Sequence, residues 1–281
     1  MPSISILCVD FNRNFQLEAS AMEQDIFYIL TPPAQLPRLR PFDCRPAHLA
    51  YRISPTLRLL RLQGAQHLRG GVMAVCDCPE SPRGDPGLFA MELLRECTFR
   101  GFRGVILDLE RPTHPLIPVL PRLESLLTRQ GIALFLPEKY AASLPNAKVL
   151  LSSAISGGSL AQRLNESTQR FGRDRLVLAV EKTAEDFLLP APSGSGCPLT
   201  PTQLQPHTAP AFFSPALCAQ YSTYRDNEGR IHLVLFDDAH SIPRKIHLAR
   251  RAGITRFLLP WREISAGPEE FGLPRFTQKK S

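Results

Sequence analysis

The sequence predicts an α/β fold in which a single (β/α)8 barrel of the TIM type spans residues 1–281 as one domain. Short strands that are apolar on both faces alternate with amphipathic helices, which is typical of a parallel sheet covered by helices. Eight or nine such strands can be identified, and that number suits a closed barrel better than an open sheet. The length of 281 residues is close to the roughly 250 residues of such barrels, although it also allows two ordinary domains.

The N-terminal part offers two candidates for the first barrel strand, residues 4–9 and residues 26–30, and the pattern does not decide between them. Strands at residues 48–53 and 71–76 follow. Asp85 and Pro86 then provide a helix N-cap and a proline at the first helical position. The predicted helix ends near Gly101, and its apolar face carries Phe89, Leu93 and Cys97.

The central part continues the alternation. A strand at residues 104–110 precedes a helix that carries Ile117, Leu120, Leu123 and Leu127. Gly131 suits the position just after the end of that helix. Further strands are predicted at residues 132–136, 149–151 and 176–180, with a helix around Leu160 and Leu164 between the last two.

Residues 189–215 depart from this pattern, because they hold seven prolines and a Ser-Gly-Ser-Gly run, and we expect a long irregular loop there. Residues 219–236 predict a β-hairpin around Asp226-Asn227-Glu228-Gly229. A helix from Ser241 to Gly253 and a last strand at residues 256–259 complete the chain. The loop and the hairpin are therefore inserted before the last barrel strand.

Charge and cysteine content narrow the classes of partner. The net charge is +7, but the basic residues are scattered and no basic run with interleaved aromatics occurs, so we expect no nucleic-acid partner. No apolar run reaches the ~18 residues of a membrane span. The seven cysteines are odd in number and the N-terminus does not resemble a signal peptide, which favours a reducing, cytoplasmic location.

Neither a metal nor another cofactor is expected. The histidines and cysteines lack metal-ligand spacing, and no glycine fingerprint for a nucleotide occurs. The sequence does not indicate an oligomeric state.

Two carboxylates mark the strongest candidate for chemistry. Asp108 and Glu110 close an apolar strand, and the two-residue period points both side chains to the same side. The carboxyl ends of barrel strands form the active-site face. Close carboxylates split their pKa values, and a glutamate that holds its proton can act as the general acid that cleaves a glycosidic bond. The alternative is an Asp-x-Glu pair that caps the strand and pairs with Arg111.

The run Gly104-Val105-Ile106-Leu107-Asp108-Leu109-Glu110 resembles the end of the glycoside hydrolase family 18 signature, Asp-Gly-x-Asp-x-Asp-x-Glu. A second stretch is similar to the last segment of that family and comprises Leu235-Phe236-Asp237-Asp238, Ser241-Ile242, Lys245, Leu248-Ala249, Gly253 and Trp261. The chain looks most like the short bacterial members related to spore-cortex and peptidoglycan-acting hydrolases.

The resemblance implies a divergent hydrolase of N-acetylhexosamine-containing glycan, peptidoglycan or chitin-like, that works by substrate-assisted retention. Glu110 would protonate the leaving oxygen, and the 2-acetamido oxygen of the substrate would attack the anomeric carbon. Asp108 would orient that acetamide, and Trp261 would floor the sugar pocket. The partner would be an oligosaccharide or cell-wall glycan. The alternative for Trp261 is a tryptophan of the barrel-end core.

Departures from the family pattern leave the activity open. Arg103 and Ile106 stand where the signature has its first two aspartates. Ile106 is expected to point into the barrel beneath Asp108, where it removes a supporting hydrogen bond. No tyrosine occurs around residues 152–156, where the family places one after strand six. Two alternatives therefore stand beside hydrolysis: a catalytically inactive relative that binds glycan, and a structural or interaction barrel.

Other polar residues at predicted strand ends are expected to line the cleft, namely Tyr51, Asp77, Glu138 and Glu181. Each is also an ordinary strand-end or loop residue. An ion pair with Lys182 is the plain alternative for Glu181.

Overall fold

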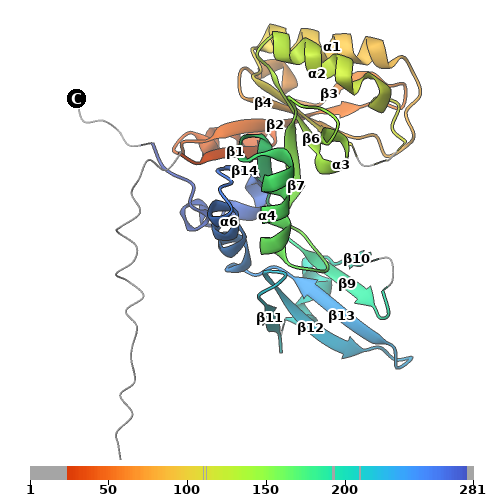
Figure 1. The fold of residues 1–281 in the computed structure, drawn as a ribbon, viewed down its shortest axis with the longest axis vertical. Helices are drawn as coiled ribbons and strands as arrows, with labels where there is room; N and C mark the ends of the chain where they lie inside the picture. Colours follow the sequence, from red (N-terminus) through yellow and green to blue (C-terminus); the bar gives the residue numbers. More distant parts are fainter. Residues whose placement is uncertain (1–23, 110, 112, 192–193, 209, 277–281) are drawn as a thin grey trace, which may run out of the picture.

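The computed structural model describes residues 24–276 except 110, 112, 192–193 and 209. Within this part, eight parallel strands close into a barrel, because the first strand pairs with both the second and the last (Figure 1). The prediction of a TIM-type barrel is confirmed. The barrel strands are β1 (Ile26–Thr31), β2 (Arg45–Ile53), β4 (Val72–Cys76), β5 (Gly104–Asp108), β6 (Ala133–Pro137), β7 (Lys148–Ser152), β8 (Leu176–Ala179) and β14 (Arg256–Pro260).

The structure decides the identity of the first barrel strand. It is β1, whereas the other candidate, residues 4–9, lies outside the described residues. One strand that the sequence analysis did not predict, β3 (Leu59–Arg61), runs antiparallel to β2 at the outer edge of the sheet.

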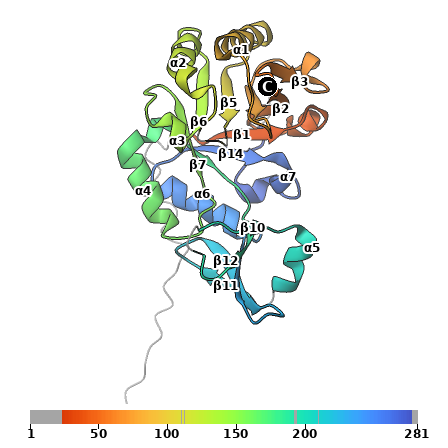
Figure 2. The same ribbon diagram turned by 90° about the vertical axis from the view of Figure 1, so that its right-hand side faces the viewer.

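Helices cover the outer face of the barrel (Figures 1 and 2), namely α1 (Pro86–Arg100), α2 (Leu120–Arg129), α3 (Glu138–Ala141), α4 (Leu160–Phe171), α6 (Ser241–Arg251) and α7 (Trp261–Ile264). Local signals set the ends of α1, as predicted. The Asp85 carboxylate accepts a hydrogen bond from the Gly87 amide at 2.7 Å, and Pro86 occupies the first helical position. Gly101 ends the helix with a φ of 66°, which glycine adopts without steric cost. None of the helices in the described part of the chain is long and apolar enough to cross a membrane.

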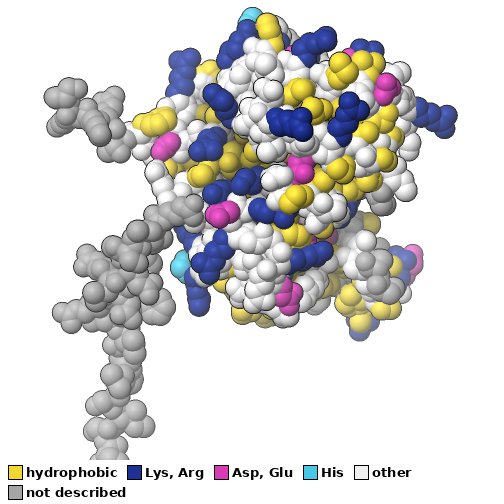
Figure 3. All heavy atoms as spheres, turned by 45° about the horizontal axis from the view of Figure 1, so that its top comes forward, with side chains coloured by type: hydrophobic (Ala, Val, Ile, Leu, Met, Phe, Trp, Pro, Cys, Tyr) yellow, Lys and Arg dark blue, Asp and Glu magenta, His cyan; other side chains and the backbone are white. Residues whose placement is uncertain are grey.

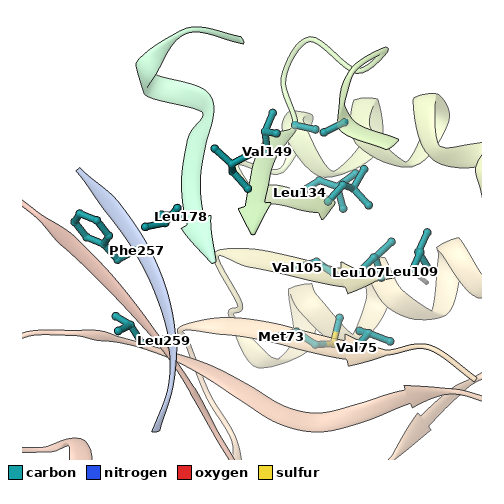
Figure 4. Close-up of a cluster of buried hydrophobic side chains, with 14 of the residues drawn as sticks. Met73, Val75, Val105, Leu107, Leu109, Leu134, Val149, Leu178, Phe257 and Leu259 are labelled. Carbon is teal, nitrogen blue, oxygen red and sulfur yellow. The ribbon is translucent and has the colours of Figure 1, made fainter. Parts of the chain in front are cut away.

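The barrel strands bury both of their faces. Side chains on the outer face pack between the strands and the helices, and Figure 4 shows such residues on β4, β5, β6, β7, β8 and β14. The alternate residues fill the barrel interior, where Ala74, Ile106, Phe135, Val177 and Leu258 belong to one apolar cluster. This two-sided burial explains why the strands appear in the sequence as continuous apolar runs.

A second sheet is inserted between β8 and β14 and projects from the barrel (Figures 1 and 2). It is antiparallel and has the order β10-β9-β13-β12-β11. The predicted hairpin is confirmed as β12 (Ala219–Arg225) and β13 (Ile231–Phe236). The strand β9 (Ala184–Leu188) was not predicted, because Phe187 is its only buried residue and it lacks an apolar pattern.

The proline-rich stretch is not irregular throughout. It carries the short elements β10 (Cys197–Pro198), α5 (Pro201–Leu204) and β11 (Phe212–Ser214), and a 3-10 helix at Gln205–His207. Its prolines are compatible with them, because Pro198 lies on an edge strand and Pro201 opens a helix.

Basic side chains are scattered over the face of the molecule that Figure 3 shows. On the face drawn in Figure 3, Lys and Arg side chains alternate with hydrophobic and uncharged ones. This distribution agrees with the scattered positions of the basic residues in the sequence.

Candidate functional site

A cavity of about 430 Å³ opens at the carboxyl ends of the barrel strands. Residues from the ends of all eight barrel strands or from the positions just after them line it, and most are apolar. Its polar or charged lining residues are Cys76, Asp108, Lys139, Ser152 and Glu181. The cavity therefore lies on the face where barrels of this type hold their active sites.

Asp108 is the last residue of β5 and opens into this cavity. It stands in register with Cys76 at the end of the neighbouring strand β4. Ile106 lies beneath it, is 4% exposed and belongs to the interior cluster, which confirms its predicted orientation. An isoleucine can neither donate nor accept a hydrogen bond, so Asp108 receives no polar support from that position.

Glu110 lies outside the described residues, but the chain beside it is held firmly. The guanidinium of Arg111 donates hydrogen bonds to the backbone carbonyls of Cys78, Pro79 and Glu80, in the loop after β4. The Tyr140 hydroxyl donates to the Arg111 carbonyl. Arg111 is therefore occupied by backbone carbonyls of the neighbouring loop.

Asp77 is buried against the same loop. Its Oδ1 lies 3.1 Å from Nε2 of His114, and both side chains are almost inaccessible to solvent. His114 Nδ1 accepts a hydrogen bond from the Leu116 amide, so the proton of the neutral ring is on Nε2, facing Asp77. Burial lowers the pKa of His114, although the charge of Asp77 opposes this shift. The pair fixes the segments after β4 and β5 to each other, and neither residue lines the cavity.

Glu181 follows β8 and does line the cavity. The Ser152 hydroxyl at the end of β7 donates a hydrogen bond to its Oε2 at 2.7 Å. The Glu181 amide donates to the Ser153 hydroxyl at 3.1 Å. Ser152 was not among the predicted site residues. It lies two residues after Leu150 on the same strand, and this spacing indicates that both side chains face the cavity.

Three other predicted site residues, Tyr51, Glu138 and Trp261, do not line the cavity. Tyr51 is fully buried on the outer side of β2, where its hydroxyl donates to Glu96 at 3.0 Å. The outward orientation of Tyr51 follows from a register irregularity between Leu49 and Tyr51, because a bulge reverses the alternation of inward and outward side chains along the strand. Glu138, the first residue of α3, forms ion pairs with two arginines of α4, Arg163 at 3.1 Å and Arg170 at 3.7 Å.

Trp261 is 4% exposed and packs against Phe42, with the ring centroids 6.2 Å apart. It is not among the residues that line the cavity, whereas the preceding residue, Pro260, is. Because successive residues of an extended chain face opposite sides, the inward position of Pro260 directs Trp261 outward. This placement matches the alternative of a tryptophan in the barrel-end core.

The described residues provide no group of three or more His, Cys, Asp or Glu side chains arranged to hold a metal ion. The described lining of the cavity offers carboxylate, hydroxyl, thiol and amine groups.

No family profile matches the chain, and no curated protein matches its sequence. Solved structures do match its fold. The spore cortex-lytic enzyme SleL of Bacillus megaterium superposes with a TM-score of 0.57 at 13% identity, over 85% of this chain and 71% of that one. A chitinase of Chromobacterium violaceum gives 0.57 at 12% identity, over 84% of this chain and 93% of that one. A family 18 chitinase of Cycas revoluta in complex with (GlcNAc)3 gives 0.53 at 14% identity, over 83% and 94%.

These identities are low, so the matches establish the fold and not the activity. The superpositions agree with the closed eight-stranded barrel of this chain. The chain therefore has a TIM-type barrel similar to the solved glycoside hydrolase family 18 structures, with a widely diverged sequence.

Proposed function

We propose that this protein binds an N-acetylhexosamine-containing glycan at the carboxyl-end cavity and hydrolyses it by substrate-assisted retention. The observation that carries the proposal is the position of Asp108, which opens into that cavity two residues before Glu110. The structurally similar chitinase of Cycas revoluta was solved with an N-acetylglucosamine oligomer. Apolar walls with a few polar groups suit a sugar ring, which has apolar faces and a polar edge.

In the proposed reaction, the acetamido oxygen of the substrate attacks the anomeric carbon while the bond to the leaving sugar breaks. Glu110 transfers its proton to the leaving oxygen, and Asp108 accepts a hydrogen bond from the acetamide N–H. Water then attacks the anomeric carbon of the cyclic intermediate, the bond between that carbon and the acetamido oxygen breaks to restore the acetamide, and a proton of the water returns to Glu110. Configuration is retained and no enzyme nucleophile is needed.

A second candidate is a barrel that binds glycan without cleaving it. Two observations favour it: Ile106 offers Asp108 no hydrogen bond, and the residues described as lining the cavity include neither tyrosine nor tryptophan. Asp108 therefore lacks a supporting hydrogen bond from Ile106, and no described tyrosine in the cavity lining is placed to hold the acetamide oxygen. The two candidates share the site and differ in turnover.

Hydrolysis of a fluorogenic N-acetylglucosamine oligomer and of purified peptidoglycan tests the proposal. We expect Glu110→Gln to lower kcat by about 10²–10⁴-fold, because the reaction loses its general acid, with little change in KM. Glu166→Gln, on the exposed face of α4, is the matched control and should retain wild-type turnover.

Binding is measured in parallel, with Ser152→Phe to fill the cavity and Ser125→Phe, on the exposed face of α2, as its control. We expect Ser152→Phe to abolish glycan binding and Ser125→Phe to leave it unchanged. Binding without turnover in the wild type would reject hydrolysis and support the second candidate. Absence of both binding and turnover would reject both.

A further inference from the structure

A second cavity, of about 580 Å³, lies at the opposite end of the barrel, where the strands begin. The described residues that line it include four basic side chains and no acidic one. Arg45, Lys148 and Arg256 open β2, β7 and β14, and Arg103 directly precedes β5. On the face drawn in Figure 3 the basic side chains are dispersed, whereas here four of them line one cavity.

The strand period directs three of these side chains inward. Arg45 precedes Ala47 by two residues, Lys148 precedes Leu150, and Arg256 precedes Leu258; the second residue of each pair contributes to the interior cluster. Residues two apart on a strand face the same side. The three cations therefore lie below the apolar core at this end of the barrel, with Lys148 and Arg256 half-buried and Arg45 exposed at the rim.

The floor of this cavity is aromatic. Tyr28 and Phe135 line it with their rings edge to face and the centroids 5.1 Å apart. Arg45 lies over the Tyr28 ring, 5.8 Å from its centroid. A ligand in this cavity would meet cationic groups at the rim and flat apolar surface below them.

Among the described residues, Asp174 contacts two of these cations. Lys148 Nζ donates to the backbone carbonyl of Asp174 at 2.8 Å, and Arg256 Nη1 lies 3.8 Å from the Asp174 carboxylate, whose side chain is 85% exposed. The Arg256 side chain itself is only 14% exposed. Burial, followed by the charge of Arg256, lowers the pKa of Lys148. Lys148 and Arg256 therefore repel each other, and an anion placed between them would attract both.

We propose that the cavity at the start of the barrel strands binds a small molecule carrying phosphate groups. Guanidinium groups match phosphate oxygens with paired hydrogen bonds, and a lysine adds a point charge. The volume lies within the ~300–1,000 Å³ of small-molecule sites. The site is separate from the glycan cavity, because the apolar barrel interior lies between the two ends.

Calorimetric titration of the full chain with inorganic pyrophosphate, at constant ionic strength, tests the proposal. We expect saturable binding to the wild type and at least about tenfold weaker binding to Lys148→Met and to Arg45→Gln, since each loses a charge-assisted contact. Arg83→Gln removes an exposed arginine near the other end of the barrel and should bind as the wild type does. Lys148→Met also removes a repulsive charge, so its melting temperature without ligand should equal or exceed that of the wild type.

Two further titrations identify the ligand class. Tighter binding of adenosine diphosphate than of pyrophosphate would support an organic phosphate whose ring contacts Tyr28 and Phe135, and equal affinities would support an inorganic polyphosphate. Citrate bound as tightly as pyrophosphate would overturn the preference for phosphate. No saturable binding, or equal pyrophosphate affinity in the wild type and both variants, would overturn the site.

Discussion

Replacing Asp237 with alanine is expected to lower the free energy of unfolding by about 3–5 kcal/mol, because it leaves a buried ammonium group without its counter-ion. Oδ2 of Asp237 accepts hydrogen bonds from Lys245 Nζ at 2.6 Å and from the Thr183 amide at 2.7 Å. The side chains of Asp237 and Lys245 are 0% and 1% exposed. A buried charge that loses its partner costs free energy because it is also removed from bulk water.

The Asp237–Lys245 pair lies where the inserted sheet joins the barrel, which increases the expected loss of stability. Thr183 directly precedes β9 and Asp237 directly follows β13, so the two residues are the ends of the inserted sheet. The Asp237 amide also donates to the Thr183 carbonyl at 2.8 Å. Lys245 reaches this junction from α6 and thereby connects the inserted sheet to the helical layer of the barrel.

Urea-induced unfolding followed by circular dichroism measures the loss. Glu228→Ala is the control, because it removes an exposed ion pair with Arg230 and should cost less than about 1 kcal/mol. The double variant Asp237→Ala/Lys245→Met should recover part of the stability, since no unpaired charge remains buried. A cost below about 1 kcal/mol for Asp237→Ala alone would contradict the importance of the pair.

Replacing Glu96 with alanine is expected to cost a similar 3–5 kcal/mol. The Glu96 carboxylate, 3% exposed on α1, accepts hydrogen bonds from Tyr51, from Arg61 and from Arg100. Arg100 is itself only 6% exposed, so the substitution leaves a buried guanidinium without its counter-ion, although Nη1 still donates to the Gln66 carbonyl, and it also removes the acceptor of the buried Tyr51 hydroxyl. Glu92→Ala, one turn earlier on α1, removes a more exposed pair with Arg58 and serves as the control, with an expected cost of about 1 kcal/mol.

The same carboxylate makes stability depend on pH in acid. Burial by itself raises the pKa of Glu96, but the hydrogen bonds from Arg61, Arg100 and Tyr51 outweigh it and bring the pKa to about 2. An unfolded glutamate has a pKa of about 4.3. The contribution to stability is therefore complete above that value and is lost as the pH falls toward 2.

Unfolding free energies of the wild type and of Glu96→Ala between pH 7 and pH 2 measure this contribution. The difference between the two proteins should be constant from pH 7 to about pH 5 and should shrink below about pH 4. A difference that stays constant down to pH 2 would show that the charge of Glu96 contributes nothing.

Local signals in the sequence determined much of the architecture. The apolar runs predicted the barrel strands from β2 onward, and the capping residues of α1 predicted its two ends, because both depend on neighbours within a few residues. The two-residue period also predicted that Ile106 lies beneath Asp108. The candidate carboxylate at the mouth of the barrel was thus visible without coordinates.

Only the tertiary structure decided which predicted residues meet at that mouth. A bulge in β2 directed Tyr51 outward, and the inward position of Pro260 directed Trp261 into the outer core. Asp77 pairs with His114, which lies in the loop after another strand. These outcomes depend on register and on partners many residues away, which periodicity does not encode. The convergence of four cations at the opposite mouth has the same origin, because barrel closure brings together strand starts far apart in the chain.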